Sequence, residues 1–407
     1  MNIGIITQWY PSGAGNVSKA YYSSLIKEHN VFIYSRGGPK LLHDEGWNQS
    51  YVTYAPKHSQ LTGINKRHFK RWVELNKITA VIFNEQRQWE AVLFAKKLNL
   101  LTGAYIDYYK QDTVNLFHAY DFLLCNTQRH LEVFKFHKQV LYIPWGTTLP
   151  TFWFVNKNKS KIRFLLLSNQ GLAYLGIAPW LDRTNTEIAV RAFQRVTGDC
   201  ELVILSQVEL SKTPKYFQDL IFTDSRINFV KETYNEFPYK KGDVYLYPSR
   251  LDGIGLTILE ALSYGMPCIT TDCQPMNEFV IDGFTGKLVK VDKFIGRPDG
   301  YYWPESLVSM DSLCNLMQYY VDCPEQVLIH GRNAIKYISE SRDWDKNASE
   351  LASHISKFKK YNLISGVEKQ MLEQDLIDNP SPIQMFIIAL KRIIKSFINE
   401  SIAFYCW

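Results

Sequence analysis

Residues 252–260 combine a glycine turn with the start of an apolar helix, and a carboxylate lies at each end of the segment. Gly253 and Gly255 allow the backbone to turn tightly and leave its amides uncovered by side chains. A helix after such a turn directs free N–H groups and the positive end of its dipole forward, which suits a phosphate. The two carboxylates can hold hydroxyl groups on either side of that phosphate. A phosphate flanked by two polyols is the chemistry of a nucleotide sugar.

The neighbouring sequence predicts a strand, loop, helix and strand around this segment. Residues 243–247 form an apolar β-prone run that Pro248 closes, and the helix can end at Gly265. A second β-prone run follows at 267–271. In open α/β sheets, ligands bind at the carboxyl ends of the strands, which is where the predicted loop lies.

These residues in this register resemble a known family, the retaining GT-B glycosyltransferases of family 4, also called glycosyl transferases group 1. Residues 248–289 match its pattern of Pro-Ser, an acidic residue, Gly-x-Gly-Leu, Glu and Gly-x-Pro, and then Glu-x4-Gly-x2-Gly from Glu278. The family carries Glu-x7-Glu in the loop, and here Asp252 takes the first position. The resemblance implies an α/β fold of the GT-B type, with two doubly wound Rossmann-like domains facing each other across a cleft and a C-terminal helical extension.

By this resemblance the loop binds the sugar donor. Glu260 would accept hydrogen bonds from the ribose hydroxyls, and Asp252 would hold hydroxyls of the donor sugar. Because Asp is one methylene shorter than Glu, the substitution can change the choice of sugar. The amides expected to face the sugar belong to Gly253, Ile254 and Gly255, and those expected to face the phosphates belong to Leu256 and Thr257.

The family also places a basic pair after the first strand of this domain. Arg183 matches the arginine and can clamp diphosphate oxygens with two hydrogen bonds, whereas Thr184 replaces the usual lysine. The alternative for this stretch is a solvated helix start with Thr184 or Asn185 as the N-cap. Val230 and Lys231 fall in the segment that lines the base pocket in the family.

Residues of the first half match the acceptor side less specifically. Gly13 and Gly15 follow the first β-prone run and open a helix, where similar loops of the family approach the donor phosphate and the acceptor. The family often has a histidine after the fourth strand of this domain, and this sequence has Asp107 and Lys110 in that region. We expect both at the acceptor side of the cleft. A core or surface role is favoured for His118, and no catalytic base is assigned.

Alternating β-prone and helix-like segments divide the chain. Strands are expected in the first half at 3–7, 31–34, 80–83, 104–106, 122–125 and 140–143, and in the second half at 163–167, 202–206, 227–230, 244–247 and 268–271. Helices are expected at 17–27, 89–98, 129–136, 187–195, 305–319, 325–339 and 345–359. The predicted units are an acceptor-side domain over 1–150, a donor-binding domain over 151–343, a helix crossing back over 344–362, and a helical tail over 363–407.

Two segments have open interpretations. The basic stretch 57–71 is either a solvated helix face or a surface for a phospholipid-linked or acidic acceptor. Residues 385–398 carry apolar side chains at helical spacing, with Lys391, Arg392 and Lys395 on the polar side. That pattern is typical of an interfacial membrane helix or of a helix packed on the protein, and we favour packing.

Composition excludes several classes of protein. A chain of 407 residues can form two or three domains with their own cores, and a net charge of +6 does not indicate a nucleic-acid partner. The seven cysteines are scattered without zinc-site spacing, which indicates reduced thiols in a cytoplasmic protein. The amino terminus lacks the features of a signal peptide, and no run has the length of a membrane span. We therefore expect a cytoplasmic protein, with peripheral contact to the cytosolic face of a membrane as an open question.

The sequence thus predicts a retaining hexosyltransferase that moves a hexose from a UDP- or GDP-linked sugar to a glycan or lipid-linked acceptor. Neither a metal ion nor another cofactor is expected. A catalytically degenerate GT-B fold that only binds a nucleotide or glycan is the main alternative, because of Thr184 and Asp252. A non-hydrolysing epimerase and a nicotinamide dehydrogenase rank lower, since the histidine pattern of the first and the G-x-G-x-x-G of the second are missing.

Overall fold

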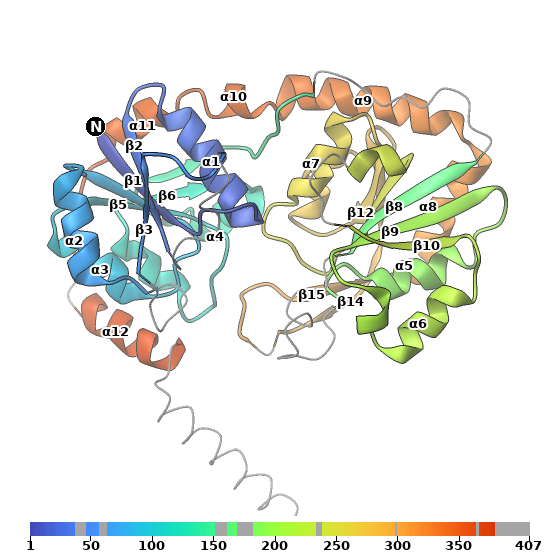
Figure 1. Cartoon of the computed structure of the whole chain (residues 1–407), viewed down its shortest axis with the longest axis horizontal. Helices are drawn as coiled ribbons and strands as arrows, with labels where there is room; N and C mark the ends of the chain where they lie inside the picture. The colour runs from blue at the N-terminus through green and yellow to red at the C-terminus, as the bar shows by residue number, and fades with distance from the viewer. Residues whose placement is uncertain are drawn as a thin grey trace, which may run out of the picture.

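The computed structural model describes residues 1–36, 46–56, 63–150, 161–168, 182–232, 238–297, 299–363 and 366–378. The amphipathic pattern at 385–398, part of the basic stretch and the first ten residues of the expected donor-binding domain, 151–160, lie outside the described residues. Two β-sheets stand side by side, each with helices against it, and the chain crosses between them along one edge (Figure 1). We refer to the two units as the first and second domains.

The first sheet holds seven strands within the described residues, and every pairing between them is parallel. Their order is β3-β2-β1-β4-β5-β6-β7, so the order reverses between β1 and β4. Such a reversal is the point at which open α/β sheets bind ligands. The bounds are β1 (Asn2–Thr7), β2 (Asn30–Ser35), β3 (Val52–Tyr54), β4 (Ala80–Phe83), β5 (Leu101–Tyr105), β6 (Phe122–Cys125) and β7 (Val140–Tyr142).

The second sheet repeats this plan with six parallel strands in the described part of the chain. Their order is β10-β9-β8-β11-β12-β13, and it reverses between β8 and β11. The bounds are β8 (Ile162–Ser168), β9 (Cys200–Ser206), β10 (Ile227–Lys231), β11 (Val244–Tyr247), β12 (Cys268–Thr271) and β13 (Gly286–Val289).

Helices cover the sheets, and apolar packing continues from one domain into the other. A single buried apolar cluster includes Ile5 of β1, Leu165 of β8 and Trp344, which follows the second domain in the chain. The main helices are α1 (Gly13–Leu25), α2 (Lys66–Leu75), α3 (Trp89–Lys97), α4 (Gln128–Phe134), α5 (Thr186–Phe193), α6 (Lys215–Phe222), α7 (Leu256–Ser263), α8 (Met310–Asp322) and α9 (Glu325–Ser341).

Most predicted strands are confirmed to within one or two residues, and three expectations are wrong. Strand β5 begins at Leu101, earlier than the expected start, and β3 was not predicted. The helix expected from residue 305 begins only at Met310, because the Ser309 side chain caps it there. The helix expected over 345–359 is divided into α10 (Trp344–Asn347) and α11 (Leu351–Lys357).

The residues before α8 form a hairpin that extends to the first domain. Strand β14 (Val291–Ile295) pairs antiparallel with β15 (Glu305–Val308). Between them, Tyr301 pairs with Lys110 of the first domain in a β-bridge, and its ring stacks on Tyr108 with centroids 5.0 Å apart. The Trp303 indole N–H donates to the Tyr109 hydroxyl at 2.6 Å. The hairpin therefore connects the two domains beside the carboxyl ends of their strands.

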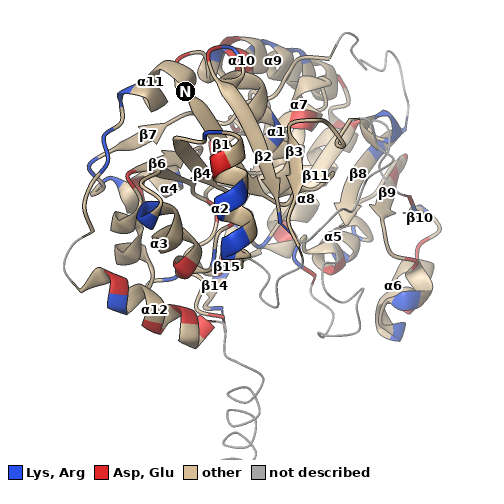
Figure 2. Cartoon of the chain, turned by 60° about the vertical axis from the view of Figure 1, so that its left-hand side comes forward, with Lys and Arg blue, Asp and Glu red and all other residues tan. Residues whose placement is uncertain are grey.

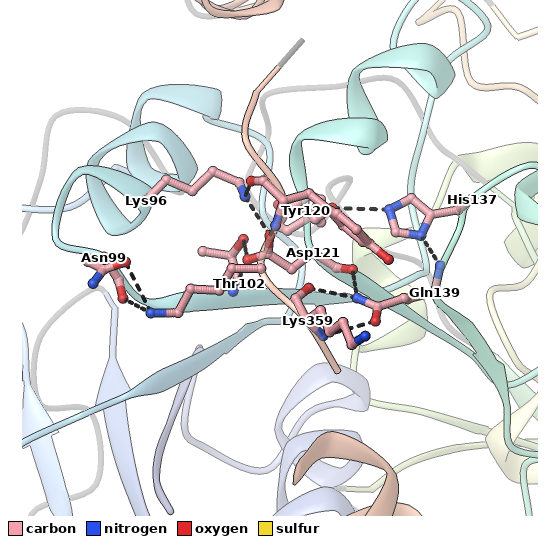
Figure 3. Close-up of polar contacts among 10 residues, drawn as sticks. Lys96, Asn99, Thr102, Tyr120, Asp121, His137, Gln139 and Lys359 are labelled. Atoms are coloured by element: carbon pink, nitrogen blue, oxygen red, sulfur yellow. Dashed lines mark hydrogen bonds and ion pairs between the residues drawn. The ribbon is translucent and has the colours of Figure 1, made fainter. Parts of the chain in front are cut away.

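After α9 the chain returns to the first domain, where Asp121 anchors it (Figure 3). This carboxylate is fully buried and accepts hydrogen bonds from the Thr102 amide at 2.7 Å and the Tyr361 amide at 2.7 Å. It also pairs with the Lys96 ammonium at 2.8 Å. Gln139 extends the anchor, since its side-chain amide bonds both the carbonyl and the N–H of Lys359, at 2.8 and 2.9 Å.

The last described helix, α12 (Val367–Asp378), packs on α3 of the first domain. The Asp375 carboxylate accepts hydrogen bonds from the Trp89 and Glu90 amides, both at 2.7 Å, and so caps α3. Asp378 pairs with Lys110. The exact domain boundaries predicted from the sequence remain predictions.

Candidate functional site

The glycine loop lies between β11 and α7, at the carboxyl end of a central strand of the second sheet. Gly255 is the N-cap of α7 and has the left-handed conformation, with φ of 64°. A Cβ atom at this position would come within 3.2 Å of Ile258 and Phe279 side chains, so the loop requires glycine. Among the described residues, no side chain caps α7. The helix start is therefore open to a ligand anion.

Three tyrosines form a column beneath this loop, and each donates its hydroxyl hydrogen to it. Tyr239 donates to the Glu260 carboxylate at 2.7 Å, and Tyr245 donates to the Thr257 hydroxyl at 2.9 Å. Tyr247 donates to the Asp252 carboxylate. Neighbouring rings of the tyrosine column are 5.8 and 5.7 Å apart. Both carboxylates predicted to bind the sugar donor, Asp252 and Glu260, therefore accept hydrogen bonds from this column.

The environment of Glu260 differs from that of a surface carboxylate. Burial raises its pKa, and the hydrogen bond from Tyr239 lowers the pKa by a smaller amount. Removal of Tyr239 would leave this half-buried carboxylate without that partner.

Arg183 and Thr184 lie just before α5 and have opposite environments. Arg183 exposes its side chain, although protein lies on most sides of it. Desolvation lowers the pKa of Arg183, but the charge of Asp252 and then Tyr247 outweighs this, so its pKa is raised. Thr184 is 1% exposed, and its hydroxyl lies 3.0 Å from that of Thr186. Position 184 therefore places no charge beside Arg183.

The N-cap of α5 is Asn185, one of the two residues expected there, but its side chain does not do the capping. Asn185 occupies the N-cap position with φ of 55°, but its side chain makes no capping bond and donates to the Pro248 carbonyl at 2.8 Å. The capping carboxylate is that of Asp182, which accepts from the Thr186 and Glu187 amides at 2.7 and 2.8 Å. Asn185 instead connects the start of α5 to the beginning of the glycine loop.

The loop after β1 approaches the glycine loop from the first domain. Gly13 begins α1, and a Cβ atom there would lie 3.8 Å from the Leu256 side chain. Ser12 caps α1 by accepting from the Gly15 amide at 3.1 Å. A Cβ atom at Gly15 would collide with the Tyr10 carbonyl at 1.9 Å, so this turn also requires glycine.

Asp107 and Lys110 follow β5, but their side chains face different partners. The Asp107 carboxylate accepts from the Tyr108 amide at 2.7 Å, and its carbonyl accepts from the Tyr301 hydroxyl at 3.2 Å. Desolvation, and then the charge of Glu85, raise the pKa of Asp107 to about 7. The Lys110 ammonium instead pairs with Asp378 of α12. Asp107 therefore lies beside the hairpin, and Lys110 anchors the returning chain.

Val230 and Lys231 end β10 at the edge of the second sheet. The Lys231 ammonium pairs with Glu209 at 2.6 Å, and both side chains are exposed. The residues that follow from 233 to 237 lie outside the described ranges. The expected role in lining a base pocket stays a prediction.

Several residues that contact the loop were not predicted from the sequence. Tyr247 ends an apolar run, where a tyrosine is read as a core residue, and Tyr239 lies between Pro238 and two lysines, with no pattern that marks a site. Arg129 of α4 donates to the Asp252 carbonyl at 2.6 Å, across 123 positions of sequence. Tyr301 lies outside every strand and helix expected from the sequence. No local spacing marks Arg129 or Tyr301, because their partners are distant in the chain.

The described residues contain no group of three or more histidine, cysteine, aspartate or glutamate side chains that could hold a metal ion. Within the same ranges, every helix is too short or too polar to cross a lipid bilayer.

Comparison with known proteins identifies the second domain. Residues 170–296 match the family model described as Glycosyl transferases group 1. This part of the second domain is therefore similar to the group 1 glycosyltransferases. This match contains the glycine loop, Arg183 and Glu278, so the predicted resemblance is confirmed for this part of the chain.

Curated relatives are glycosyltransferases by name, and solved structures share the fold. The UDP-Gal:alpha-D-GlcNAc-diphosphoundecaprenol alpha-1,3-galactosyltransferase of Escherichia coli is 26% identical over 239 residues, which is 56% of this chain and 58% of that protein. The sucrose-phosphate synthase of Thermosynechococcus elongatus superposes with a TM-score of 0.66 at 14% identity, covering 88% of this chain and 98% of that one. Anabaena HepE, in complex with UDP and glucose, superposes with a TM-score of 0.65 at 12% identity, covering 88% of this chain and 100% of that one. The predicted GT-B fold is confirmed by these superpositions.

The two loop glycines give a matched pair of substitutions. Gly255→Ala should lower the free energy of unfolding of the second domain by about 1–2 kcal/mol, because it combines a left-handed φ with a crowded Cβ. Gly253→Ala should change it by less than about 0.5 kcal/mol, since a Cβ there meets no atom within 4 Å. Urea unfolding of the three proteins measures both values. Equal stability of the two variants would contradict the described loop conformation.

Proposed function

We propose that this chain is a retaining hexosyltransferase that moves a hexose from a nucleotide-diphosphate sugar to a glycan or lipid-linked acceptor. The observation that carries the proposal is the glycine loop, in which an uncapped helix start lies between two carboxylates held by tyrosines. The Escherichia coli relative is named for a UDP-galactose donor, and HepE was solved with UDP and glucose. Both names support a UDP-linked sugar as the first donor to test, with GDP-linked sugars as the alternative.

In the proposed complex, the second domain binds the donor. Glu260 accepts hydrogen bonds from the ribose hydroxyls, and the start of α7 binds the diphosphate through its amides and dipole. Arg183 neutralises charge that develops on the leaving diphosphate, which lowers the barrier to transfer. Asp252 holds hydroxyls of the sugar. The charge of the diphosphate is met by Arg183 and α7, so the proposed reaction needs no metal ion.

A nucleotide screen tests this proposal. UDP, GDP and ADP are added separately in a thermal-shift assay, and one of them should raise the unfolding temperature, because a ligand of the native state stabilises it. Glu260→Gln should weaken binding of that nucleotide about tenfold, since an amide is a weaker acceptor for the ribose hydroxyls. Glu132→Gln is the control, because Glu132 is an exposed residue of the first domain whose ion-pair partner within the described ranges is Lys135, at 2.6 Å.

The outcomes separate the enzyme from its alternative. No stabilisation by any nucleotide, together with no transfer or hydrolysis of nucleotide sugars, would refute the proposal. Nucleotide binding without turnover would instead identify a binding module, for which the uncharged Thr184 would be a reason. Unchanged affinity in Glu260→Gln would make that residue structural.

The acceptor is proposed to bind at the first domain beside Asp107. The Tyr301 hydroxyl donates to the backbone carbonyl of Asp107, and besides burial the charges of Asp107 and Asp252 both raise the pKa of Tyr301, so the hairpin tyrosine is near acidic groups of both domains. An ionised carboxylate accepts hydrogen bonds from sugar hydroxyls, whereas its protonated form accepts them less well.

This position predicts a pH dependence. Asp107 is an acid with a pKa of about 7, so its ionised form accumulates above that pH. The kcat/KM for the acceptor should therefore rise about tenfold per pH unit well below pH 7 and level off above it. Asp107→Asn should remove this rise. The same pH profile in wild type and Asp107→Asn would show that Asp107 does not take part.

Peripheral membrane contact is proposed through α2. Lys66, Arg67, Lys70 and Arg71 of this helix are exposed, and Figure 2 shows the basic residues on its outer turns. Lys66 pairs with Glu90 and Lys70 pairs with Glu74, which leaves the two arginines as the residues to test. A basic helix of this kind is attracted to anionic lipid headgroups.

Vesicle sedimentation tests this contact. Binding to vesicles that contain phosphatidylglycerol should fall several-fold in the double variant Arg67→Ala/Arg71→Ala and should weaken with added salt. The double variant Lys212→Ala/Lys215→Ala, which removes the same charge from the second domain, should bind like wild type. Wild-type binding by the α2 variant would exclude this helix as the contact.

A further inference from the structure

Arg129 extends from the first domain to the glycine loop of the second. It is the second residue of α4, and its side chain is 2% exposed. The guanidinium donates one hydrogen bond to the Asp252 carbonyl at 2.6 Å and another to the Gln274 carbonyl at 2.7 Å. The central carbon of the guanidinium, Cζ, lies 5.0 Å from the centre of the Trp303 ring of the hairpin. Arg129 therefore bonds the backbone of the loop after β11 and the backbone just after β12, which are the carboxyl ends of two neighbouring strands.

The start of α4 is fixed to the second domain by a separate contact. The Glu278 carboxylate accepts hydrogen bonds from the Gln128 amide at 2.6 Å and the Arg129 amide at 2.9 Å. The Arg342 guanidinium bonds the Glu278 carbonyl at 2.6 Å. Glu278 can therefore hold the domains together without the Arg129 side chain, and that side chain must have another role.

The Asp252–Gly253 peptide is the group that the Arg129 side chain can orient. Its N–H donates to the Asp252 carboxylate at 2.6 Å, and its carbonyl accepts from Arg129. Gly253 has no side chain, and a Cβ there would meet nothing within 4 Å, so packing does not fix this peptide. The two hydrogen bonds are therefore the constraints on its direction, and one comes from the other domain.

The cost of burying Arg129 also argues against a role in packing alone. Its partners on the glycine loop side are neutral carbonyls, and its Nε atom is buried without a hydrogen-bond partner within the described residues. Burying a charge is unfavourable, and the nearby Glu278 carboxylate, whose pKa burial raises and the charge of Arg129 lowers in part, offsets part of that cost. An apolar side chain would join the two domains without burying a charge.

We propose that Arg129 is a positioning residue for the donor site, which orients the Asp252–Gly253 peptide and so completes the glycine loop only when the two domains are docked. This inference rests on the proposed function, because it assigns the loop to the donor sugar. It adds a residue of the acceptor-side domain to the machinery that binds the donor.

Hydrogen exchange of the loop amides tests the proposal without any need for activity. In Arg129→Met, which keeps an apolar stem against Trp303, the amides of residues 253–257 should exchange at least about tenfold faster than in wild type. Arg129→Lys should be intermediate, because an ammonium can bond one of the two carbonyls. Lys27→Ala is the matched control. It removes an exposed ion pair between the turn after α1 and Asp345 of α10, with nitrogen and oxygen 3.0 Å apart, and should leave these amides unchanged.

Turnover of the same variants tests the consequence for the reaction. Arg129→Met should lower kcat about tenfold to a hundredfold, as small misplacements of catalytic groups do. Its affinity for the free nucleotide should stay within about threefold of wild type, because Tyr239 holds Glu260 from within the second domain. Added guanidinium should restore part of the turnover of Arg129→Met.

Two results would overturn the inference: loop exchange equal to wild type in Arg129→Met, or faster exchange spread evenly over both domains. If Arg129→Met does not fold, Arg129→Lys decides by the same comparison. A wild-type protein that neither binds nucleotides nor turns over nucleotide sugars would refute the proposed function, while the exchange data would still decide whether Arg129 orients the loop.

Discussion

Parallel pairing requires all strands of a sheet to end at the same edge, and in this chain those edges meet. The strands are buried on both faces, so polar groups collect where the strands end. Gly13 after β1 lies against Leu256 of the glycine loop, and Asp107 after β5 lies beside Tyr301 of the hairpin. Each contact joins a strand end of the first domain to a segment of the second. The site therefore belongs to the pair of domains, and the returning chain that Asp121 anchors helps to keep them together.

The tyrosine column, formed by β11 and the short turn of helix before it, explains how an apolar sheet can support two carboxylates. Phenylalanine at position 239 or 247 would pack as well but would leave Glu260 or Asp252 without a donor beneath it. An unsatisfied carboxylate in a half-buried position is costly. Tyrosine supplies both the apolar ring and a hydroxyl at its end. Because burial still raises the pKa of Glu260 despite the bond from Tyr239, the column limits the cost of burying the site and does not remove it.

The glycine loop could be predicted because its determinants are local. A turn with left-handed φ needs glycine at a fixed place, so Gly255 is visible in the sequence, and the strand before it has a clear apolar run. The partners of the loop could not be predicted in this way. Arg129 meets Asp252 across 123 positions, and its short helix has no distinctive pattern. The hairpin was missed because Leu307 and Val308 continue the apolar spacing of α8, while the cap at Ser309 carries a weaker signal.

Asp252 shows why a residue that departs from the family pattern can still fit its site. Its short side chain accepts hydrogen bonds from the Tyr247 hydroxyl and from the Gly253 amide, which belongs to the same turn. Its charge also raises the pKa of Arg183, which has no cationic neighbour at position 184. A glutamate would place the carboxylate one methylene further from the turn and weaken both local bonds. The Asp252 carboxylate therefore links the loop to Tyr247 through a hydrogen bond and to Arg183 through its charge. Arg129 holds the backbone of the same loop from the other domain.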